Sequence, residues 1–397
     1  MRSLLFFVGL CVALTATAAS QGSFGPEYAL EVFPAEHQTR TDPGSGAALL
    51  FLTSNPARDT NFYFHERSWM ADNSAIFFYS DRERGGLMGY IVETGELFRV
   101  DTPEGGVGAA TAAVNRNSIF VMRGLDAVEI AITITPGQNG PSTVAAKARV
   151  IATVMGGEGM TSLNESCEGK YLALGVRQPK DGGDSVILLV EEQSGVVTNL
   201  CRIPMADGFA YHVQWSHTNP NLLSFAGYKH RLNVVDIRTG AISNPYIELP
   251  GELVTHEHWW VNDQIVFCGG LHPKPTEDAH VKVVDVHTGL VRIIGAGAWW
   301  PEGTPEQVSR YNYWHCAGSD DGRWVVADNW HGDITVFEAK TTRPHIVTSG
   351  HRTYGSGDHP HVGWDRLSKQ VIFASHMQGN ADVCVATIPE AWQNANP

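Results

Sequence analysis

Histidine is the residue type whose distribution along this chain most clearly indicates chemistry. The sequence holds 17 His residues, and 15 of them lie at or beyond His212. Imidazole nitrogens bind divalent metals and exchange protons near neutral pH. Five of these side chains stand at the start of a recurring β pattern, and we expect them to converge on one mouth of a central channel: His212, His256, His315, His359 and His361.

The segment His359-Pro360-His361 is the sharpest local signal for metal binding. In an extended segment residues i and i+2 face the same way, so both imidazoles can approach one ion. His315, from the preceding repeat, supplies a third nitrogen. Three protein ligands with open positions are typical of a catalytic metal site rather than a closed structural one. These residues therefore predict one bound divalent ion.

The elements that must position these side chains are short β-rich runs, each preceded by a polar turn. A turn followed by an apolar, β-branched or aromatic run predicts a strand. Seven such strands recur at a spacing of roughly 40 to 55 residues: 75–79, 118–122, 171–174, 222–225, 264–267, 324–327 and 370–373.

A second β element followed by a tight turn comes after most of these strands. It is found at 91–95, 190–195, 234–240 and 283–289, with a degenerate copy at 336–342. Four strands per repeat at this period are typical of a propeller. We therefore predict an all-β fold, a seven-bladed β-propeller, in which residues 47–53 pair with the last blade and close the ring.

The N-terminus has the pattern of a cleaved secretion signal. Arg2 precedes the apolar run 4–14, and Ala16-Thr17-Ala18 offers a cleavage site. We expect a signal peptide over 1–19, a single seven-bladed propeller domain over 20–397, and a secreted or periplasmic protein. The apolar run is shorter than the roughly 20 residues needed to span a bilayer, so no membrane insertion is expected.

Composition limits the possible partners. The chain is 43% apolar, with a formal net charge of −14 at pH 7. Nucleic-acid binding requires a basic surface, so this charge argues against it. An acidic substrate would need a local cationic site to overcome the overall repulsion.

At this point the sequence resembles the oligogalacturonate lyase family, which are seven-bladed propeller polysaccharide lyases. The resemblance runs from about Asn61 to the C-terminus and is clearest from Tyr211 onward. Its motifs are Tyr63-Phe64-His65 with Asp72, the segments 212–215 and 255–259, Arg231, His315 before Asp321-Gly322, and His359-Pro360-His361.

The resemblance implies a role for each matching residue. His256 would be the Brønsted base, and Arg231 would bind the substrate carboxylate. His315, His359 and His361 would hold a divalent metal, manganese in the family, with zinc or calcium as alternatives. The family has a Gln three residues before the His-Pro-His segment, where this sequence has Ser356. The fourth ligand is therefore left open between Ser356, Asp358 and water.

The implied reaction is β-elimination at a 4-linked uronic acid in an acidic polysaccharide or oligosaccharide of the pectate type. Either His212, Tyr63, His65 or a water would protonate the leaving oxygen. Aromatic faces can stack on sugar rings, and Trp259 and Trp314 are the preferred candidates because each neighbours a channel-facing His. Three alternatives remain: an ulvan lyase-type enzyme acting on a sulfated uronate polymer, a non-catalytic secreted binding propeller, and a copper redox enzyme.

Overall fold

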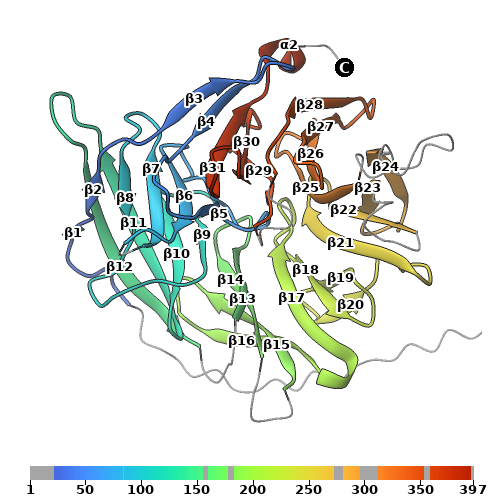
Figure 1. Ribbon diagram of the computed structural model, residues 1–397. Helices are drawn as coiled ribbons and strands as arrows, with labels where there is room; N and C mark the ends of the chain where they lie inside the picture. Colours follow the sequence, from blue (N-terminus) through green and yellow to red (C-terminus); the bar gives the residue numbers. More distant parts are fainter. Residues whose placement is uncertain are drawn as a thin grey trace, which may run out of the picture.

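Seven antiparallel sheets surround a common centre (Figure 1). The computed structural model describes residues 22–83, 85–154, 160–177, 183–271, 280–295, 312–352 and 358–394. The prediction of an all-β, seven-bladed propeller is confirmed. The predicted signal peptide, 1–19, lies outside the described residues.

The first three blades are formed by the N-terminal half of the chain. The first contains β5 (Asp59–Asn61), β6 (Ala75–Ser80), β7 (Gly86–Ile91) and β8 (Leu97–Arg99). The second contains β9 (Ala110–Ala112), β10 (Ser118–Arg123), β11 (Asp126–Thr135) and β12 (Thr143–Thr153). The third contains β13 (Met160–Glu165), β14 (Tyr171–Arg177), β15 (Ser185–Glu191) and β16 (Val197–Ile203).

The next three blades contain most of the histidines. The fourth contains β17 (Gly208–Trp215), β18 (Leu222–Tyr228), β19 (Asn233–Asp236) and β20 (Ala241–Ser243). The fifth contains β21 (Glu252–Trp259), β22 (Gln264–Leu271), β23 (His280–Asp285) and β24 (Val291–Gly295). The sixth contains β25 (Tyr313–Gly318), β26 (Trp324–Asn329), β27 (Ile334–Glu338) and β28 (Pro344–Thr348).

The seventh blade closes the ring with both ends of the chain. Its strands are β29 (Gly363–Trp364), β30 (Gln370–Ser375), β31 (Asp382–Thr387), β4 (Ala48–Phe51) and β3 (Gln38–Thr41). Phe51 pairs with Cys384 and Leu49 with Ala386, which confirms the predicted closure. The expectation of four strands in every blade is wrong for three of them. The N-terminal strands β1 (Tyr28–Ala29), β2 (Val32–Phe33) and β3 each add an outer fifth strand.

The repeated tight turn has one conformation in four blades. In each, a glycine N–H donates to the carbonyl four residues earlier at 2.8–2.9 Å, and the glycine φ lies between 69° and 76°. Such left-handed φ values favour glycine, which has no Cβ. This requirement explains the recurrence of glycine at 95, 195, 240 and 289.

The core lies between the blades rather than in one central layer. Leu52, Trp69 and Phe78 from the start of the chain pack with Ile372 and Val383 near its end. Because neighbouring blades cover both faces of a middle strand, β6 reads as a nearly continuous apolar run without alternation.

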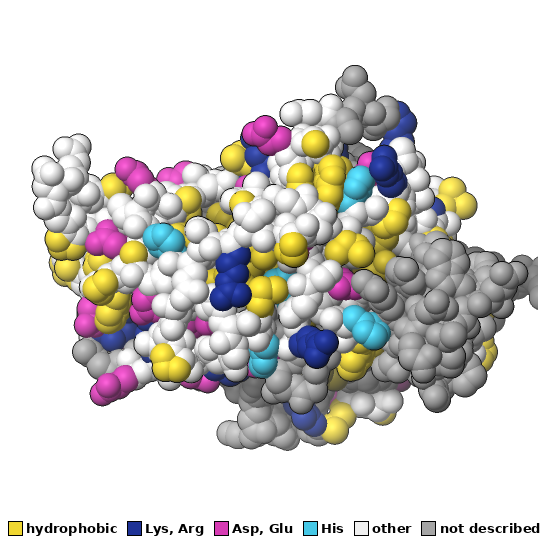
Figure 2. Space-filling model, turned by 45° about the horizontal axis from the view of Figure 1, so that its top comes forward, with side chains coloured by type: hydrophobic (Ala, Val, Ile, Leu, Met, Phe, Trp, Pro, Cys, Tyr) yellow, Lys and Arg dark blue, Asp and Glu magenta, His cyan; other side chains and the backbone are white. Residues whose placement is uncertain are grey.

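Regular helix is confined, in the described ranges, to a 3-10 turn (Met205–Asp207) and to α2 (Glu390–Gln393). Among these residues no helix is long and apolar enough to cross a membrane. On the face drawn in Figure 2, Lys and Arg side chains are scattered among other types rather than gathered in one basic patch.

Candidate active site

Backbone irregularities aim the key histidines at the centre of the ring. The pairing of β17 with β18 shifts register between Tyr211 and Gln214, and that of β21 with β22 shifts between Thr255 and His258. Within these bulges His212 has φ 52° and His256 has φ 53°. Left-handed φ in a non-glycine residue costs about 1–3 kcal/mol and concentrates at functional sites. The bulges re-aim both imidazoles out of the regular strand alternation.

The same feature recurs in the last two blades. β25 shifts its register against β26 between Tyr313 and Cys316, around His315. His361, two residues before β29, has φ 49°. The predicted convergence on the centre is therefore produced by four local distortions, one in each of four successive blades.

The structure brings His315, His359 and His361 together. One ring nitrogen from each of the three lies within 4.8 Å of the other two. This spacing allows one divalent ion to contact all three after small ring rotations, at ligand distances of about 2.0–2.3 Å. We call these three residues the histidine triad.

Asp328 orients the buried member of the triad. Its Oδ2 lies 2.7 Å from Nδ1 of His315, and its Oδ1 accepts the His315 backbone N–H at 2.8 Å. A carboxylate only accepts, so Nδ1 carries the hydrogen and the lone pair is on Nε2. A carboxylate on the far nitrogen is the usual partner of a metal-binding histidine.

The protonation state of the triad also suits a metal. Burial lowers the pKa of His315 and His361 well below the ordinary imidazole value, and the neighbouring imidazoles lower it further. Burial lowers the pKa of His359 as well. All three rings are therefore neutral near pH 7, the form that offers a lone pair to a cation.

His256 lies beside the triad with a defined tautomer. Its ring centroid is 4.1 Å from that of His315 and 5.3 Å from that of Trp314. Nδ1 lies 2.7 Å from the carbonyl oxygen of Trp314, which can only accept, so Nδ1 carries the hydrogen. Burial, followed by the positive charge of nearby histidines, lowers the His256 pKa well below 6.5. Nε2 is therefore an unprotonated nitrogen that can take up a proton.

Glu257 links two further predicted residues. Its Oε1 lies 2.9 Å from Nδ1 of His212, and its Oε2 accepts from Nε of Arg231 at 2.9 Å. Burial alone would raise the pKa of this fully buried carboxyl, but the charges of Arg231 and His212 hold it below its usual range. Glu257 is thus an anion that fixes both side chains.

Arg231 is held as a rigid fork. Besides the bond to Glu257, its Nη1 donates to the hydroxyl of Tyr211 at 2.7 Å, and its guanidinium lies over the Tyr211 ring. A guanidinium has five N–H donors, so hydrogens remain on both Nη atoms for a ligand. Arg231 is the fixed cation that an acidic substrate requires.

Tyr63 completes this network from the first blade. Its hydroxyl lies 3.1 Å from Nε2 of His212. Since Nδ1 of His212 donates to Glu257, Nε2 accepts and the Tyr63 O–H donates. The Tyr63 ring also lies 4.6 Å from His361 and 6.5 Å from His256. Tyr63 therefore bridges the metal side and the arginine side of the site.

Two predicted substrate contacts are not supported. Trp259 is fully buried and its Nε1 donates to the Gln214 carbonyl, so its face is unavailable to a sugar. The prediction was wrong because the β21 bulge ends before Trp259 and returns it to the core. The His65 side chain is only 2% exposed and contacts Glu66, so little of it is open to a substrate.

Trp314 is half-buried and packs edge-on against the exposed Trp330, with ring centroids 5.2 Å apart. This pair is the aromatic surface beside His256.

The predicted fourth metal ligand is not supported at Asp358. This carboxylate is bonded to Arg58 and His376, so we withdraw it as a ligand. Ser356 lies outside the described residues.

Glu257 and Asp328 were missed from the sequence. Each is an acidic residue within a strand, and both are fully buried. Buried carboxylates require partners, so this pattern was a usable signal. It did not identify the partner, which depends on the tertiary fold.

The fold resembles that of solved lyases. An oligogalacturonate lyase in complex with manganese superposes with a TM-score of 0.73 at 16% identity, covering 95% of this chain and 100% of that one. The oligogalacturonate lyase of Vibrio parahaemolyticus gives 0.70 at 14%, covering 91% and 99%. The Cps50 (Swd1) β-propeller domain of Myceliophteria thermophila gives 0.54 at 12%, covering 83% and 99%. No protein-family model and no curated protein matches the sequence.

The chain is therefore a seven-bladed β-propeller. Within that class, its fold is the one seen in the two oligogalacturonate lyases. At these identities the likeness establishes the fold alone.

Proposed function

We propose that the protein is a polyuronate lyase, which cleaves a 4-linked uronic acid chain of the oligogalacturonate type by β-elimination. One observation carries the proposal. His256, Arg231 and the histidine triad come from four blades and converge on one site, within a fold shared with two oligogalacturonate lyases.

The base is His256. Elimination requires removal of the C5 proton, which is α to the uronate carboxylate and only weakly acidic. Nε2 of His256 accepts this proton, while Nδ1–H remains bonded to the Trp314 carbonyl. The electron pair of the C5–H bond becomes the C4=C5 double bond. A positioned acid–base group of this kind contributes about 10²–10⁴-fold.

Negative charge builds up on the substrate carboxylate as C5 loses its proton, so a positive charge must lie beside it. The Arg231 fork, fixed by Glu257 and Tyr211, binds the carboxylate in a planar, bidentate geometry. The triad fits a divalent metal, manganese by likeness to the solved lyase complex, which when bound supplies a second positive charge near the developing enolate.

The leaving oxygen takes a proton as the C4–O bond breaks. Tyr63 is the described donor best placed to provide it, since its hydroxyl lies within the site. Burial raises the pKa of Tyr63, so the phenol remains protonated. The positive charge of Arg231 favours the phenolate that is left behind. The products are a chain with a 4,5-unsaturated uronate end and a chain with a new hydroxyl end.

The predicted signal peptide leads us to propose a secreted or periplasmic enzyme that meets fragments of an acidic polysaccharide. Trp314 and Trp330 provide the aromatic surface on which a neighbouring sugar would stack.

Incubation with oligogalacturonate, pectate, ulvan and alginate tests the proposal. The expected result is a metal-dependent rise in the ultraviolet absorbance of the unsaturated uronate with the galacturonate substrates. Product from ulvan alone would reassign the substrate. Binding of oligogalacturonate that survives metal removal, with no unsaturated product from any polymer, would favour the non-catalytic propeller.

A further inference from the structure

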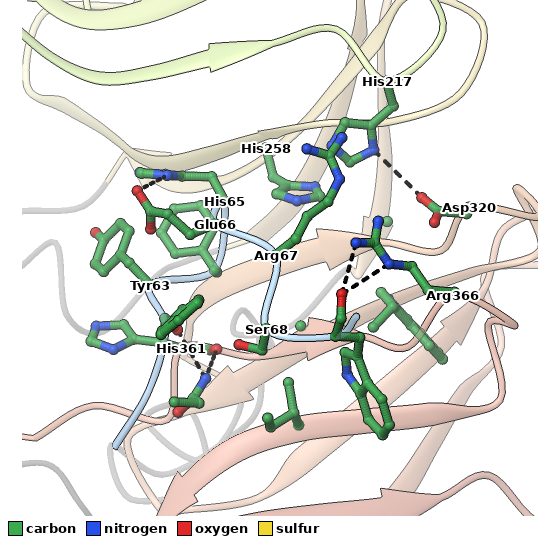
Figure 3. Close-up of a pocket in the computed structure, with 18 residues that line it drawn as sticks. Tyr63, His65, Glu66, Arg67, Ser68, His217, His258, Asp320, His361 and Arg366 are labelled. Carbon is green, nitrogen blue, oxygen red and sulfur yellow. Dashed lines mark hydrogen bonds and ion pairs between the residues drawn. The ribbon is translucent and has the colours of Figure 1, made fainter. Parts of the chain in front are cut away.

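A second polar cluster lies inside the central channel, away from the proposed reaction. We call it the channel cluster: Arg67, His217, His258, Asp320 and Arg366. Each member comes from a different blade. His258 lies within β21, and the other four follow β5, β17, β25 and β29, in the order Arg67, His217, Asp320 and Arg366. Figure 3 shows these residues on the side of the cavity opposite Tyr63 and His361.

Two buried nitrogens of the cluster lack partners among the described residues. Nη1 of Arg67 and Nδ1 of His258 are buried and make no hydrogen bond within that part of the chain. His258 is only 6% exposed and lines the cavity. An unsatisfied buried donor costs about 1–3 kcal/mol, and nearly all buried donors in proteins have a partner. Both nitrogens therefore indicate a ligand.

The charges of the cluster identify the kind of ligand. Burial, together with the charge of Arg67, lowers the pKa of Arg366 to about 10, so the Arg366 guanidinium is charged at neutral pH. Arginine side chains are always charged in proteins, so Arg67 is a second cation. Burial would raise the pKa of Asp320, but His217 and the two arginines lower it to about 2. Arg67 and Arg366 are the two cations of the cluster, and Asp320 is its one anion. Of the carboxylates nearby, Glu66 contacts His65 and Glu165 is paired with Arg116.

Arg366 and His217 already have protein partners. Arg366 donates to the carbonyl oxygens of Trp69 at 2.7 Å and Ala113 at 2.9 Å, which fixes its guanidinium in the channel. His217 lies 3.6 Å from Asp320 and packs edge-on against His258. The cluster is thus a preformed set of positive and donor groups.

The size of the cavity limits the ligand. The space open to the centres of water molecules is about 50 Å³. A site needs only about 10–15 Å³ by this measure to hold one water, so a small ion fits and a sugar ring does not.

We propose that the channel cluster binds one small inorganic anion, held between Arg67 and Arg366 with His258 as a further donor. The anion offsets the repulsion of the two guanidiniums and links the first, fifth and seventh blades across the channel. It thereby stabilises the closed ring. This site does not depend on the proposed lyase activity.

A crystal of the full-length mature protein grown in bromide tests the site directly. We expect a bromide anomalous peak in hydrogen-bond contact with Nη1 of Arg67. A sulfate in the same place after a sulfate soak would assign an oxyanion instead and also support the proposal. Absence of any anion from the cluster in both crystals would overturn it.

Thermal unfolding provides an independent measurement. Bromide should raise the Tm saturably, by roughly 2–4 °C, because it binds only the folded state. Gluconate, which is too large for the cavity, should not. Arg67→Gln should lose the effect, whereas Arg123→Gln, which removes an arginine near the surface, should keep it. Equal rises with bromide and gluconate, or in Arg67→Gln, would contradict the proposal. If Arg67→Gln fails to fold, the native bromide crystal decides.

Discussion

His256 and His258 are separated by one residue in β21, yet their imidazoles belong to different clusters. The His256 ring lies 4.1 Å from His315, while the His258 ring lies 4.9 Å from His217. The bulge between Thr255 and His258 separates them. Only His256 is beside the histidine triad, so the base is assigned to His256 rather than His258.

Replacing His256 should remove the proton acceptor without removing the metal ligands. We expect His256→Ala to lower kcat by at least about 10²–10⁴-fold, with an unchanged circular dichroism spectrum and metal content. His287→Ala, at an exposed turn histidine of the same blade, is the control and should retain activity. A folded His256→Ala protein with full elimination would transfer the base role to another residue.

Arg231→Lys should damage the carboxylate contact although the charge is kept. An ammonium cannot reproduce the planar fork, and losing one charge-assisted hydrogen bond of about 1.5–3 kcal/mol corresponds to roughly 10–100-fold in kcat/KM. Steady-state kinetics on a defined oligogalacturonate measure this loss. Arg238→Lys, at an exposed arginine, should behave as wild type. Equal kinetics in both variants would refute the role of Arg231.

Asp328→Asn should weaken metal binding through His315. Asp328 accepts from both the backbone N–H and Nδ1 of His315, whereas the Asn amide has only one acceptor oxygen and cannot keep both bonds. Loss of such a partner costs about 10–100-fold in metal affinity. Titration with manganese measures the affinity, and excess metal should restore activity. Asp42→Asn changes a buried carboxylate of the outer seventh blade and serves as the control. Unchanged metal affinity in Asp328→Asn would argue against the orientation proposed for His315.

Tyr63→Phe should slow cleavage of the C4–O bond while leaving folding and metal content intact. The ring remains, so packing against His361 is kept, but the hydroxyl that donates to His212 is lost. We expect a drop in kcat of about 10²-fold or more. A substrate analogue with a good leaving group, which needs no proton, should recover most of this loss. No recovery would indicate that Tyr63 acts in positioning.

The pH profile should reflect the lowered pKa of His256. A base with a depressed pKa stays unprotonated to lower pH, so kcat/KM should persist as pH falls past 6.5 and decline only well below it. The measurement is made with saturating manganese, and metal content is checked at each pH because the triad also protonates in acid. A half-maximal kcat/KM at pH 6.5 or above would contradict a buried His256 base.

The sequence determined the propeller and the approximate place of the site. Repeated turns and strands are local signals, because a glycine with φ near 70° and a β-branched run act within a few residues. The closing strand could be predicted because the last blade of a closed ring is completed by a strand from the other end of the chain. The number of outer strands could not, since β1 and β2 pair with strands more than 60 positions away along the chain, and β3 pairs with β4 of the closing blade.

Tertiary structure decided which side chains meet. Trp259 and His256 are three residues apart. The bulge between Thr255 and His258 places Trp259 in the core and His256 in the site. Glu257 was inconspicuous until His212 and Arg231 were placed on either side of it. Strand periodicity fixes which face a side chain occupies only where the strand is regular. At this site the backbone departs from regularity in four blades, so strand alternation does not show which side chains meet there.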